Sequence, residues 1–374
     1  MRKIKILFFI HQLNSGGSQK VMLNLLRNIS KEKFDVCLIV INNVGEFSDF
    51  QHPGVRVIDL ESKQIRNSIF KIVSVIKDEQ PDIIFSGISI LSLIFSGLKL
   101  LSAISTSVKL VSRETNTLSV SNKTFKYPWL MNLMYRRVYK RFDLIICQSG
   151  EMRADLVANF NIPESSVTVI NNPVDFSNIE AHLSDAGEAL FAPDVVNLLA
   201  VGRLHRNKGF DMLLEAISKL GASYHLHIVG AGSEEASLKQ LADALGVSDR
   251  VHFLGFQRNP YRYMQQADLF ILSSRHEGFP NVVLEANACG TPVVAFRCPG
   301  VSEEIIAEGV NGFLVDGFDT DRMKEKIMQA LAHKWDKYAI KGYIHDRFRS
   351  EKIVAQYEEK LMMTYAPATG LSNA

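Results

Sequence analysis

Two pairs of charged side chains in the second half of this 374-residue chain could do chemistry together. Glu277 and Glu285 stand eight residues apart in the segment RHEGFPNVVLEA, and Arg203 and Lys208 flank a loop within the segment VGRLHRNKG. An arginine and a lysine beside a strand end can neutralise a diphosphate, and arginine can bind it with two parallel hydrogen bonds. Carboxylates can accept hydrogen bonds from the hydroxyls of a sugar. The alternative is that the cations are solvated surface charges and the two acids are unrelated.

The segment between the two acids should begin a helix. Pro280 suits the first helical turn, which places Glu277 in the preceding loop and Glu285 one to two turns into the helix. Free amides at residues 281–283 could hold a phosphate. Residues 284–288 read as a largely buried stretch, so Glu285 should need hydrogen-bonding partners there.

A second candidate loop lies near the N-terminus, in the segment NSGGSQK (residues 14–20). Gly16 and Gly17 permit positive φ angles and close approach of another group to the backbone. The helix that follows offers free amides to an anion. The alternative is a tight turn in which Ser18 caps the helix.

The elements that must position these loops alternate between strand and helix. Apolar runs at 4–10, 36–41, 55–60, 83–85, 108–112, 144–148 and 167–170 predict strands, with amphipathic helical stretches between several of them. A second series of strands follows at 195–201, 224–229, 251–254, 269–272 and 293–295. Such alternation predicts two α/β domains with doubly wound parallel sheets, which would face each other across a cleft. Ligands of such sheets bind beyond the carboxyl ends of the strands, where the candidate loops lie.

The predicted boundaries follow from turn signals and from helical spacing. The Asn-Pro pair at 172–173 marks the joint between domains 1–173 and 174–345. Residues 346–374 should form a C-terminal helix, which could cross back to the first domain, and a tail. Residues 177–194 are interpreted as a loop or an insertion.

Composition is that of a globular protein, with 47% hydrophobic and 22% charged residues. Four cysteines far apart indicate neither a disulfide framework nor a zinc site and favour a reducing compartment. The N-terminus does not look like a signal peptide, and the apolar stretch 83–98 is too short and too rich in serine for a membrane span. The sequence Asp319-Thr320-Asp321 could suggest a metal, but it precedes an amphipathic helix, which favours helix capping.

The chain resembles glycosyltransferase family 4 in four segments taken together. They are VGRLHRNKGFDMLLEA, the spaced acids of EGFPNVVLEA, the following GTPVVA and the early GGS loop. The resemblance covers residues 4 to about 330. It implies the GT-B fold, with two Rossmann-like domains around a cleft, and sugar transfer with retained anomeric configuration. It also implies that no metal or other cofactor is required, because cations stabilise the leaving diphosphate.

The resemblance also assigns roles to residues. Arg203 and Lys208 would bind the donor diphosphate, Glu285 the ribose and Glu277 the transferred sugar. The donor site is expected to comprise Gly16, Gly17, Arg203, Lys208, Gly230, Gly255, Gly278, Phe279, Pro280, Asn281, Val282 and Glu285. Gly230 and Gly255 match loops of the base pocket, although each could simply make a tight turn.

One segment departs from the family pattern. Many members carry a histidine after a strand of the N-terminal domain, but LVSRETNT (110–117) has none. It looks more like a variant found in members that make bacterial surface polysaccharides. Arg113 and Glu114 are therefore candidate catalytic residues, and Asn116 and Ser18 are candidates for contact with the sugar or the acceptor. The alternative is that Arg113 and Glu114 belong to a surface loop.

Residues 123–142, KTFKYPWLMNLMYRRVYKRF, combine six cations with six aromatic residues and no acid. This composition suits an anionic membrane surface, and residues 1–172 hold 22 Lys and Arg against 14 Asp and Glu. The alternative is a helix that packs its aromatic residues into the core. Nothing in the sequence indicates a nucleic-acid-binding module.

The sequence therefore predicts a retaining glycosyltransferase that moves a hexose or N-acetylhexosamine from a nucleotide-diphosphate donor, preferably a UDP-sugar. The acceptor would be lipid-linked or a polysaccharide in bacterial cell-surface glycan synthesis. The enzyme would be cytoplasmic and peripheral on the inner face of the cytoplasmic membrane. The alternatives are a UDP-sugar 2-epimerase of GT-B fold and a non-catalytic protein that binds sugar nucleotides.

Overall fold

The computed structural model describes residues 2–14, 16–184, 189–301 and 303–366 and divides the chain into two compact units. The N-terminal unit comprises residues up to Pro173 together with those from Ser350, and the C-terminal unit comprises Val174–Arg349. The expected boundary after residue 345 falls inside the helix α13 (Lys337–Phe348), because that helix stays packed in the C-terminal unit.

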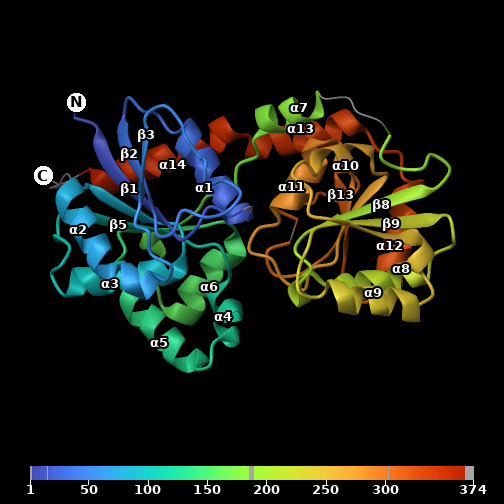
Figure 1. Ribbon diagram of the computed structural model, residues 1–374, viewed down its shortest axis with the longest axis horizontal. Helices are drawn as coiled ribbons and strands as arrows, with labels where there is room; N and C mark the ends of the chain where they lie inside the picture. The colour runs from blue at the N-terminus through green and yellow to red at the C-terminus, as the bar shows by residue number, and fades with distance from the viewer. Residues whose placement is uncertain (1, 15, 185–188, 302, 367–374) are drawn as a thin grey trace, which may run out of the picture. The chain divides into compact units, whose positions relative to one another are not determined.

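A seven-stranded parallel sheet forms the centre of the N-terminal unit, in the order β3-β2-β1-β4-β5-β6-β7 (Figure 1). Its strands are β1 (Ile4–Ile10), β2 (Phe34–Val40), β3 (Val55–Asp59), β4 (Ile83–Ser86), β5 (Lys109–Arg113), β6 (Leu144–Cys147) and β7 (Val167–Val169). The central strand β1 is a continuous apolar run apart from Lys5, because both of its faces are covered.

Helices cover the N-terminal sheet on both faces and create two hydrophobic cores. They are α1 (Gly17–Asn28), α2 (Ile69–Glu79), α3 (Ser89–Leu100), α4 (Leu118–Ser121), α5 (Pro128–Val138), α6 (Gly150–Phe160) and α14 (Ser350–Tyr365). Short 3₁₀ turns are η1 (Ile65–Ser68), η2 (Asn122–Thr124), η3 (Tyr139–Arg141) and η4 (Glu164–Ser166). The C-terminal helix α14 returns to this unit and buries Ile353, Tyr357 and Leu361 against the α1 face.

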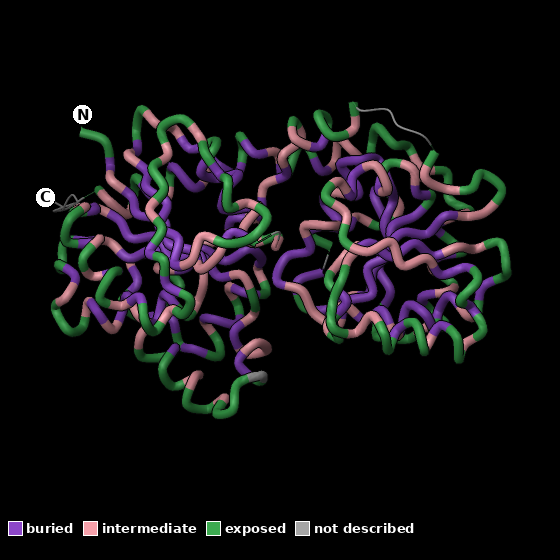
Figure 2. The backbone as a smooth tube through the Cα atoms, in the orientation of Figure 1, coloured by how far each residue is buried: buried purple, intermediate pink, exposed green. Residues whose placement is uncertain are grey.

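A six-stranded parallel sheet forms the centre of the C-terminal unit, in the order β10-β9-β8-β11-β12-β13. Its strands are β8 (Val196–Val201), β9 (Tyr224–Val229), β10 (Val251–Gly255), β11 (Leu269–Leu272), β12 (Val293–Phe296) and β13 (Gly312–Val315). Figure 2 shows buried backbone along the central strands of each unit. The carboxyl ends of β8 and β11, which are neighbours in this sheet, carry the two predicted donor loops.

The helices of the C-terminal unit include α7 (Phe176–Leu183), which lies in a stretch that was predicted to be a loop. They are α7 (Phe176–Leu183), α8 (Phe210–Ser218), α9 (Glu235–Ala244), α10 (Tyr261–Gln266), α11 (Asn281–Ala288), α12 (Thr320–Ala332) and α13, with the 3₁₀ turns η5 (Arg206–Lys208) and η6 (Ser248–Arg250). The prediction of a loop over 177–194 is wrong for α7, which is capped by Asp175 and buries Ile179. Among the described helices, none is both long and apolar enough to cross a bilayer.

Candidate active site

The loops after β8 and β11 bring Lys208 and Glu277 into direct contact. Lys208 Nζ donates to Glu277 Oε1 at 2.6 Å, and Ser274 Oγ donates to the same oxygen at 2.6 Å. The Glu277 side chain is 10% exposed and that of Lys208 is 23% exposed, so the pair is partly shielded from water. A cation and a carboxylate that the sequence placed 69 residues apart therefore form one site at the sheet edge.

Gly209 allows these two loops to touch through their backbones. Its φ angle is +64°, and a Cβ atom there would lie 2.1 Å from the carbonyl oxygen of Ser273. Ser273 Oγ in turn donates to the carbonyl oxygen of Lys208 at 2.8 Å. Any side chain at 209 would both strain the backbone and separate Lys208 from the β11 loop.

Arg203, the second predicted cation, lies on the surface after β8. Within the described residues its guanidinium has no hydrogen-bonding or ion-pair partner, so it is available to an anionic ligand. Sequence reasoning gave no role to nearby Arg275, which donates to both carboxylate oxygens of Asp211 at 2.6 and 2.7 Å. That bidentate contact lowers the pKa of Asp211 and ties the β11 loop to α8.

Glu285 occupies the fifth position of α11 and is half-buried. Tyr261 of α10 approaches Glu285 Oε1 at 3.5 Å, and burial together with this carboxylate raises the pKa of Tyr261. Pro280 is the residue before the helix rather than part of its first turn, so the helix starts one residue later than predicted.

The amides at the start of α11 are only partly free for a phosphate. The amide of Asn281 donates to the carbonyl of Phe279 at 2.9 Å, and that of Val283 donates to the carbonyl of Pro280 at 2.9 Å. Gly278, Phe279 and Pro280 are buried, whereas Asn281 and Val282 are half-buried. A ligand phosphate at this helix would therefore have to use the remaining amides or replace existing bonds.

Gly230 and Gly255 close the ends of β9 and β10. Gly230 has a φ angle of +143°, and a Cβ atom there would lie 1.9 Å from the carbonyl oxygen of Gly202. The amide of Gly230 donates to the carbonyl of Gly255 at 2.8 Å. Gly230 thus lets the β9 loop press on the residue before Arg203, which explains the glycine by close packing as well as by a turn.

Arg113 of β5 is fully buried in the N-terminal unit. Its guanidinium donates to the hydroxyl of Tyr357 at 3.1 Å and to Asn172 Oδ1 at 2.6 Å, and it approaches Ser18 Oγ at 3.5 Å. Among the described residues no carboxylate pairs with it. Contrary to the expectation of a residue exposed to ligand or solvent, Arg113 is an interior residue that links α1, α14 and the chain after β7.

Glu114 is also buried, with 1% of its surface exposed. Ser112 Oγ and the Tyr139 hydroxyl donate to its Oε1 at 2.7 and 2.6 Å, and Ser89 Oγ donates to Oε2 at 2.7 Å. Burial raises the pKa of Glu114 against the opposing effect of these donors. Both oxygens therefore accept hydrogen bonds from within the N-terminal unit, which rules out the alternative that Glu114 belongs to a surface loop.

The remaining N-terminal candidates lie nearer the surface. Gly16 precedes α1 with a φ of −68°, an angle that any residue adopts, and exposed Gly17 begins the helix. Ser18 is the second helical residue and does not cap it, because the helix starts before it. Asn116 is exposed after β5. Gly16 therefore has no conformational need for glycine, and a Cβ atom there would meet the side-chain oxygen of Gln19 at 2.6 Å.

Asp319 caps α12, as predicted. Its Oδ1 accepts hydrogen bonds from the amides of Asp321 at 2.8 Å and Arg322 at 3.3 Å. Lys219 pairs with Asp321 at 2.7 Å. Across the described part of the chain, no three histidine, cysteine or acidic side chains form a metal-binding group.

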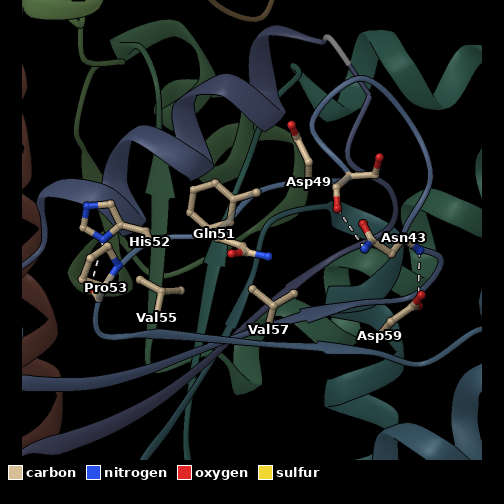
Figure 3. A pocket seen from close by; sticks show the side chains of 10 residues that line it. Asn43, Asp49, Gln51, His52, Pro53, Val55, Val57 and Asp59 are labelled. Carbon is tan, nitrogen blue, oxygen red and sulfur yellow. Dashed lines mark hydrogen bonds between the residues drawn. The ribbon is translucent and has the colours of Figure 1, made fainter.

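A pocket of about 650 Å³ lies in the N-terminal unit beside the edge strand β3 (Figure 3). The loop 43–53 forms its other wall, and Asn43 Nδ2 donates to the carbonyl of Ser48 at 3.1 Å. The lining residues are Asn43, Ser48, Asp49, Phe50, Gln51, His52, Pro53, Val55, Val57 and Asp59. No lysine or arginine lines this pocket, so its chemistry does not suit a diphosphate.

Comparison with known proteins identifies the two units separately. The model of Glycosyltransferase Family 4 matches residues 15–178, and the model of Glycosyl transferases group 1 matches residues 188–342. The chain is a glycosyltransferase built from a Glycosyltransferase Family 4 domain and a Glycosyl transferases group 1 domain. The predicted family, the two-domain α/β fold and the glycosyltransferase activity are confirmed.

Relatives of this glycosyltransferase include proteins of bacterial surface glycan synthesis. An N-acetylgalactosamine-N,N'-diacetylbacillosaminyl-diphospho-undecaprenol 4-alpha-N-acetylgalactosaminyltransferase of Campylobacter jejuni is 29% identical over 84% of this chain and 86% of that protein. The lipopolysaccharide core biosynthesis glycosyltransferase LpsE of Rhizobium meliloti is 33% identical over 52% of this chain and 55% of that protein.

Solved structures share the fold at low sequence identity. Anabaena Alr3699/HepE in complex with UDP matches with a TM-score of 0.79, 22% identity and coverage of 96% of this chain and 100% of that one. The lipopolysaccharide outer core galactosyltransferase WaaB matches with a TM-score of 0.74, 19% identity and coverage of 96% and 99%. At these identities the likeness supports the GT-B fold of the glycosyltransferase and nothing finer.

Proposed function

We propose that this glycosyltransferase transfers a hexose or N-acetylhexosamine from a UDP-sugar to a lipid-linked or polysaccharide acceptor, with retention of the anomeric configuration. The observation that carries the proposal is the contact of Lys208 with Glu277 at the carboxyl ends of two adjacent strands. There, a cation suited to a diphosphate lies beside a carboxylate suited to sugar hydroxyls.

The C-terminal unit would hold the donor. Arg203, which meets no side-chain partner among the described residues, and Lys208, which contacts Glu277, would bind the diphosphate and stabilise it as it leaves. Glu277 would bind the transferred sugar and Glu285 the ribose. Because two cations supply the charge compensation, we propose that no metal is required, so excess EDTA should leave the rate unchanged.

The proposed donor and acceptor draw support from the relatives. The Anabaena structure contains UDP, and the name of the Campylobacter protein specifies transfer of N-acetylgalactosamine to an undecaprenol-linked acceptor. A bacterial cell-surface glycan on a lipid carrier would fit the basic N-terminal half of this chain. We assign Gly16, Gly17, Ser18 and Asn116 to the acceptor or the reacting sugar.

We also propose that residues 123–142 bind the anionic inner face of the cytoplasmic membrane. Phe125, Tyr127 and Trp129 are 45%, 53% and 67% exposed beside Lys123 and Lys126, which suits an interfacial segment. The aromatic residues at 135, 139 and 142 are buried, so half of the pattern belongs to the core. In this arrangement the enzyme is cytoplasmic and peripheral.

Vesicle sedimentation tests the membrane contact. Wild-type protein should pellet with phosphatidylglycerol vesicles and not with phosphatidylcholine vesicles, and Trp129→Ala should weaken the binding. Tyr338→Ala is the matched control, because Tyr338 is an exposed aromatic residue, 88% accessible, in the other unit. Equal binding to both lipids, or equal loss in both variants, would contradict the proposal.

A panel of nucleotide sugars tests the donor. A bound UDP-sugar at one hundred times its dissociation constant should raise the free energy of unfolding by about 2.7 kcal/mol. Glu277→Ala should then abolish transfer to a lipid-linked acceptor while the protein stays folded. Release of an epimer from the UDP-sugar without any acceptor would refute the transferase and favour an epimerase.

A further inference from the structure

The two oxygens of the Glu277 carboxylate have different surroundings. Oε1 accepts hydrogen bonds from Lys208 Nζ and Ser274 Oγ, each at 2.6 Å. From the described residues, no hydrogen bond or ion pair reaches Oε2. A carboxylate oxygen has two lone pairs, so Oε1 is fully used and Oε2 retains its acceptor capacity.

Ser274 is built into the sheet edge rather than exposed in the loop. It is the second residue after β11 and is 1% exposed. Its neighbour Ser273, 2% exposed, donates to the carbonyl of Lys208. Two consecutive buried hydroxyls therefore hold the two charged partners, one through the Lys208 main chain and the other through the Glu277 side chain.

We propose that Ser274 is a positioning residue that fixes the Glu277 carboxylate and leaves Oε2 to accept a hydroxyl of the transferred sugar. Without Ser274, only the flexible side chain of Lys208 would hold Oε1, and the carboxylate could rotate about its last bond. The rigid serine hydroxyl on the same oxygen removes that freedom, because its short side chain is packed. This inference rests on the proposed function and adds a residue outside the spaced-acid motif.

The role predicts an effect on the sugar and not on the nucleotide. Ser274→Ala leaves Lys208 and Arg203 in place, so affinity for UDP should stay within about twofold of wild type. Affinity for the UDP-sugar should fall about five- to tenfold, the factor expected for one weakened hydrogen bond. A residue needed only for folding would reduce both affinities together.

Calorimetric titration with UDP and with UDP-N-acetylglucosamine, UDP-glucose and their galactose counterparts tests this. Ser274→Thr, which keeps the hydroxyl, should restore the preference for UDP-sugar over UDP. Ser274→Cys nearly keeps the side-chain volume but has only a weak donor, so it should lose the same preference as Ser274→Ala. It therefore serves as the second test if Ser274→Ala is unstable. Ser218→Ala is the control, since the Ser218 hydroxyl bonds only to the exposed main chain of α8.

The outcomes separate the two proposals. Wild-type protein that binds UDP-sugar more tightly than UDP, with the preference lost in Ser274→Ala and Ser274→Cys, supports the inference. Unchanged preference in both variants, or equal loss of both ligands, overturns it while leaving the proposed function standing. Wild-type protein that binds none of these nucleotides overturns the proposed function and this inference with it.

Discussion

The contact between Lys208 and Glu277 should be measurable as a coupling free energy. Exposed ion pairs contribute about 0–1 kcal/mol, but this pair is a charge-assisted hydrogen bond of 2.6 Å between side chains 23% and 10% exposed. Such bonds contribute about 1.5–3 kcal/mol. We therefore expect Lys208→Met and Glu277→Gln each to lower the free energy of unfolding of the C-terminal unit by about 1.5–3 kcal/mol.

The double variant should cost less than the sum of the single ones. Residues in direct contact show coupling of about 0.5–3 kcal/mol, and we expect about 1–2 kcal/mol here. Glu277→Gln keeps an oxygen that can accept from both Ser274 Oγ and Lys208 Nζ, so the cycle measures what the negative charge of Glu277 adds to the lysine contact. The exposed pair Lys239–Glu235 on α9, with a similar distance of 2.7 Å, is the control cycle and should couple by about 0.3–0.5 kcal/mol.

Urea unfolding followed by tryptophan fluorescence can report on one unit at a time. The chain has two tryptophans, of which Trp129 lies in the N-terminal unit and Trp335 in the C-terminal unit. In a Trp129→Phe background the signal comes from Trp335, whose indole donates to the carbonyl of Ala330 at 2.7 Å. Additivity within about 0.3 kcal/mol, or coupling no larger than in the control cycle, would refute the reasoning.

Three further predictions concern single positions. Because the pKa of Glu114 is raised, the folded protein holds this proton to higher pH than the unfolded chain does. Its contribution to the free energy of unfolding is therefore complete below about pH 4.5 and is lost as pH rises. In denaturant titrations from pH 4 to 8, the free energy of unfolding of Glu114→Gln should rise relative to that of wild type. Gly230→Ala should cost about 2 kcal/mol or more by thermal unfolding, because it meets Gly202, whereas Gly246→Ala, with positive φ and open space, should cost about 1 kcal/mol. Asp319→Ala should lower the melting temperature because it removes both capping bonds, and an unchanged melting temperature would contradict that cap.

The central parallel strands could be predicted because they are short apolar runs buried on both faces, unlike the more exposed edge strand β3. The run of β1 is typical, although α1 begins at Gly17, inside the segment 14–20 that was predicted as a loop. The helix α7 was missed because polar residues surround it, although Phe176, Ile179 and Leu183 have helical spacing. This spacing could have predicted the helix, but the Asn-Pro turn just before it favoured the interpretation as a loop.

The contact of Lys208 with Glu277 could be anticipated because neighbouring parallel strands end at the same sheet edge. The burial of Glu114 could not, because its partners come from distant parts of the chain. Tyr139 and Ser89 each lie 25 residues from Glu114, on either side of it in the sequence. The local sequence around neither residue indicates that it contacts a buried carboxylate. Charge favours exposure as a general rule, and long-range hydrogen bonds overrule it here.

Arg113, the last residue of β5, has partners that the sequence pattern could not reveal. Its guanidinium contacts Asn172, one residue before Pro173, and Tyr357 in the helix that returns after the C-terminal unit. It therefore fixes both segments of chain that join the N-terminal unit to the rest. A lysine could not reach these acceptors with a planar fork, so Arg113 stabilises the architecture, whereas the exposed Arg203 remains available for chemistry.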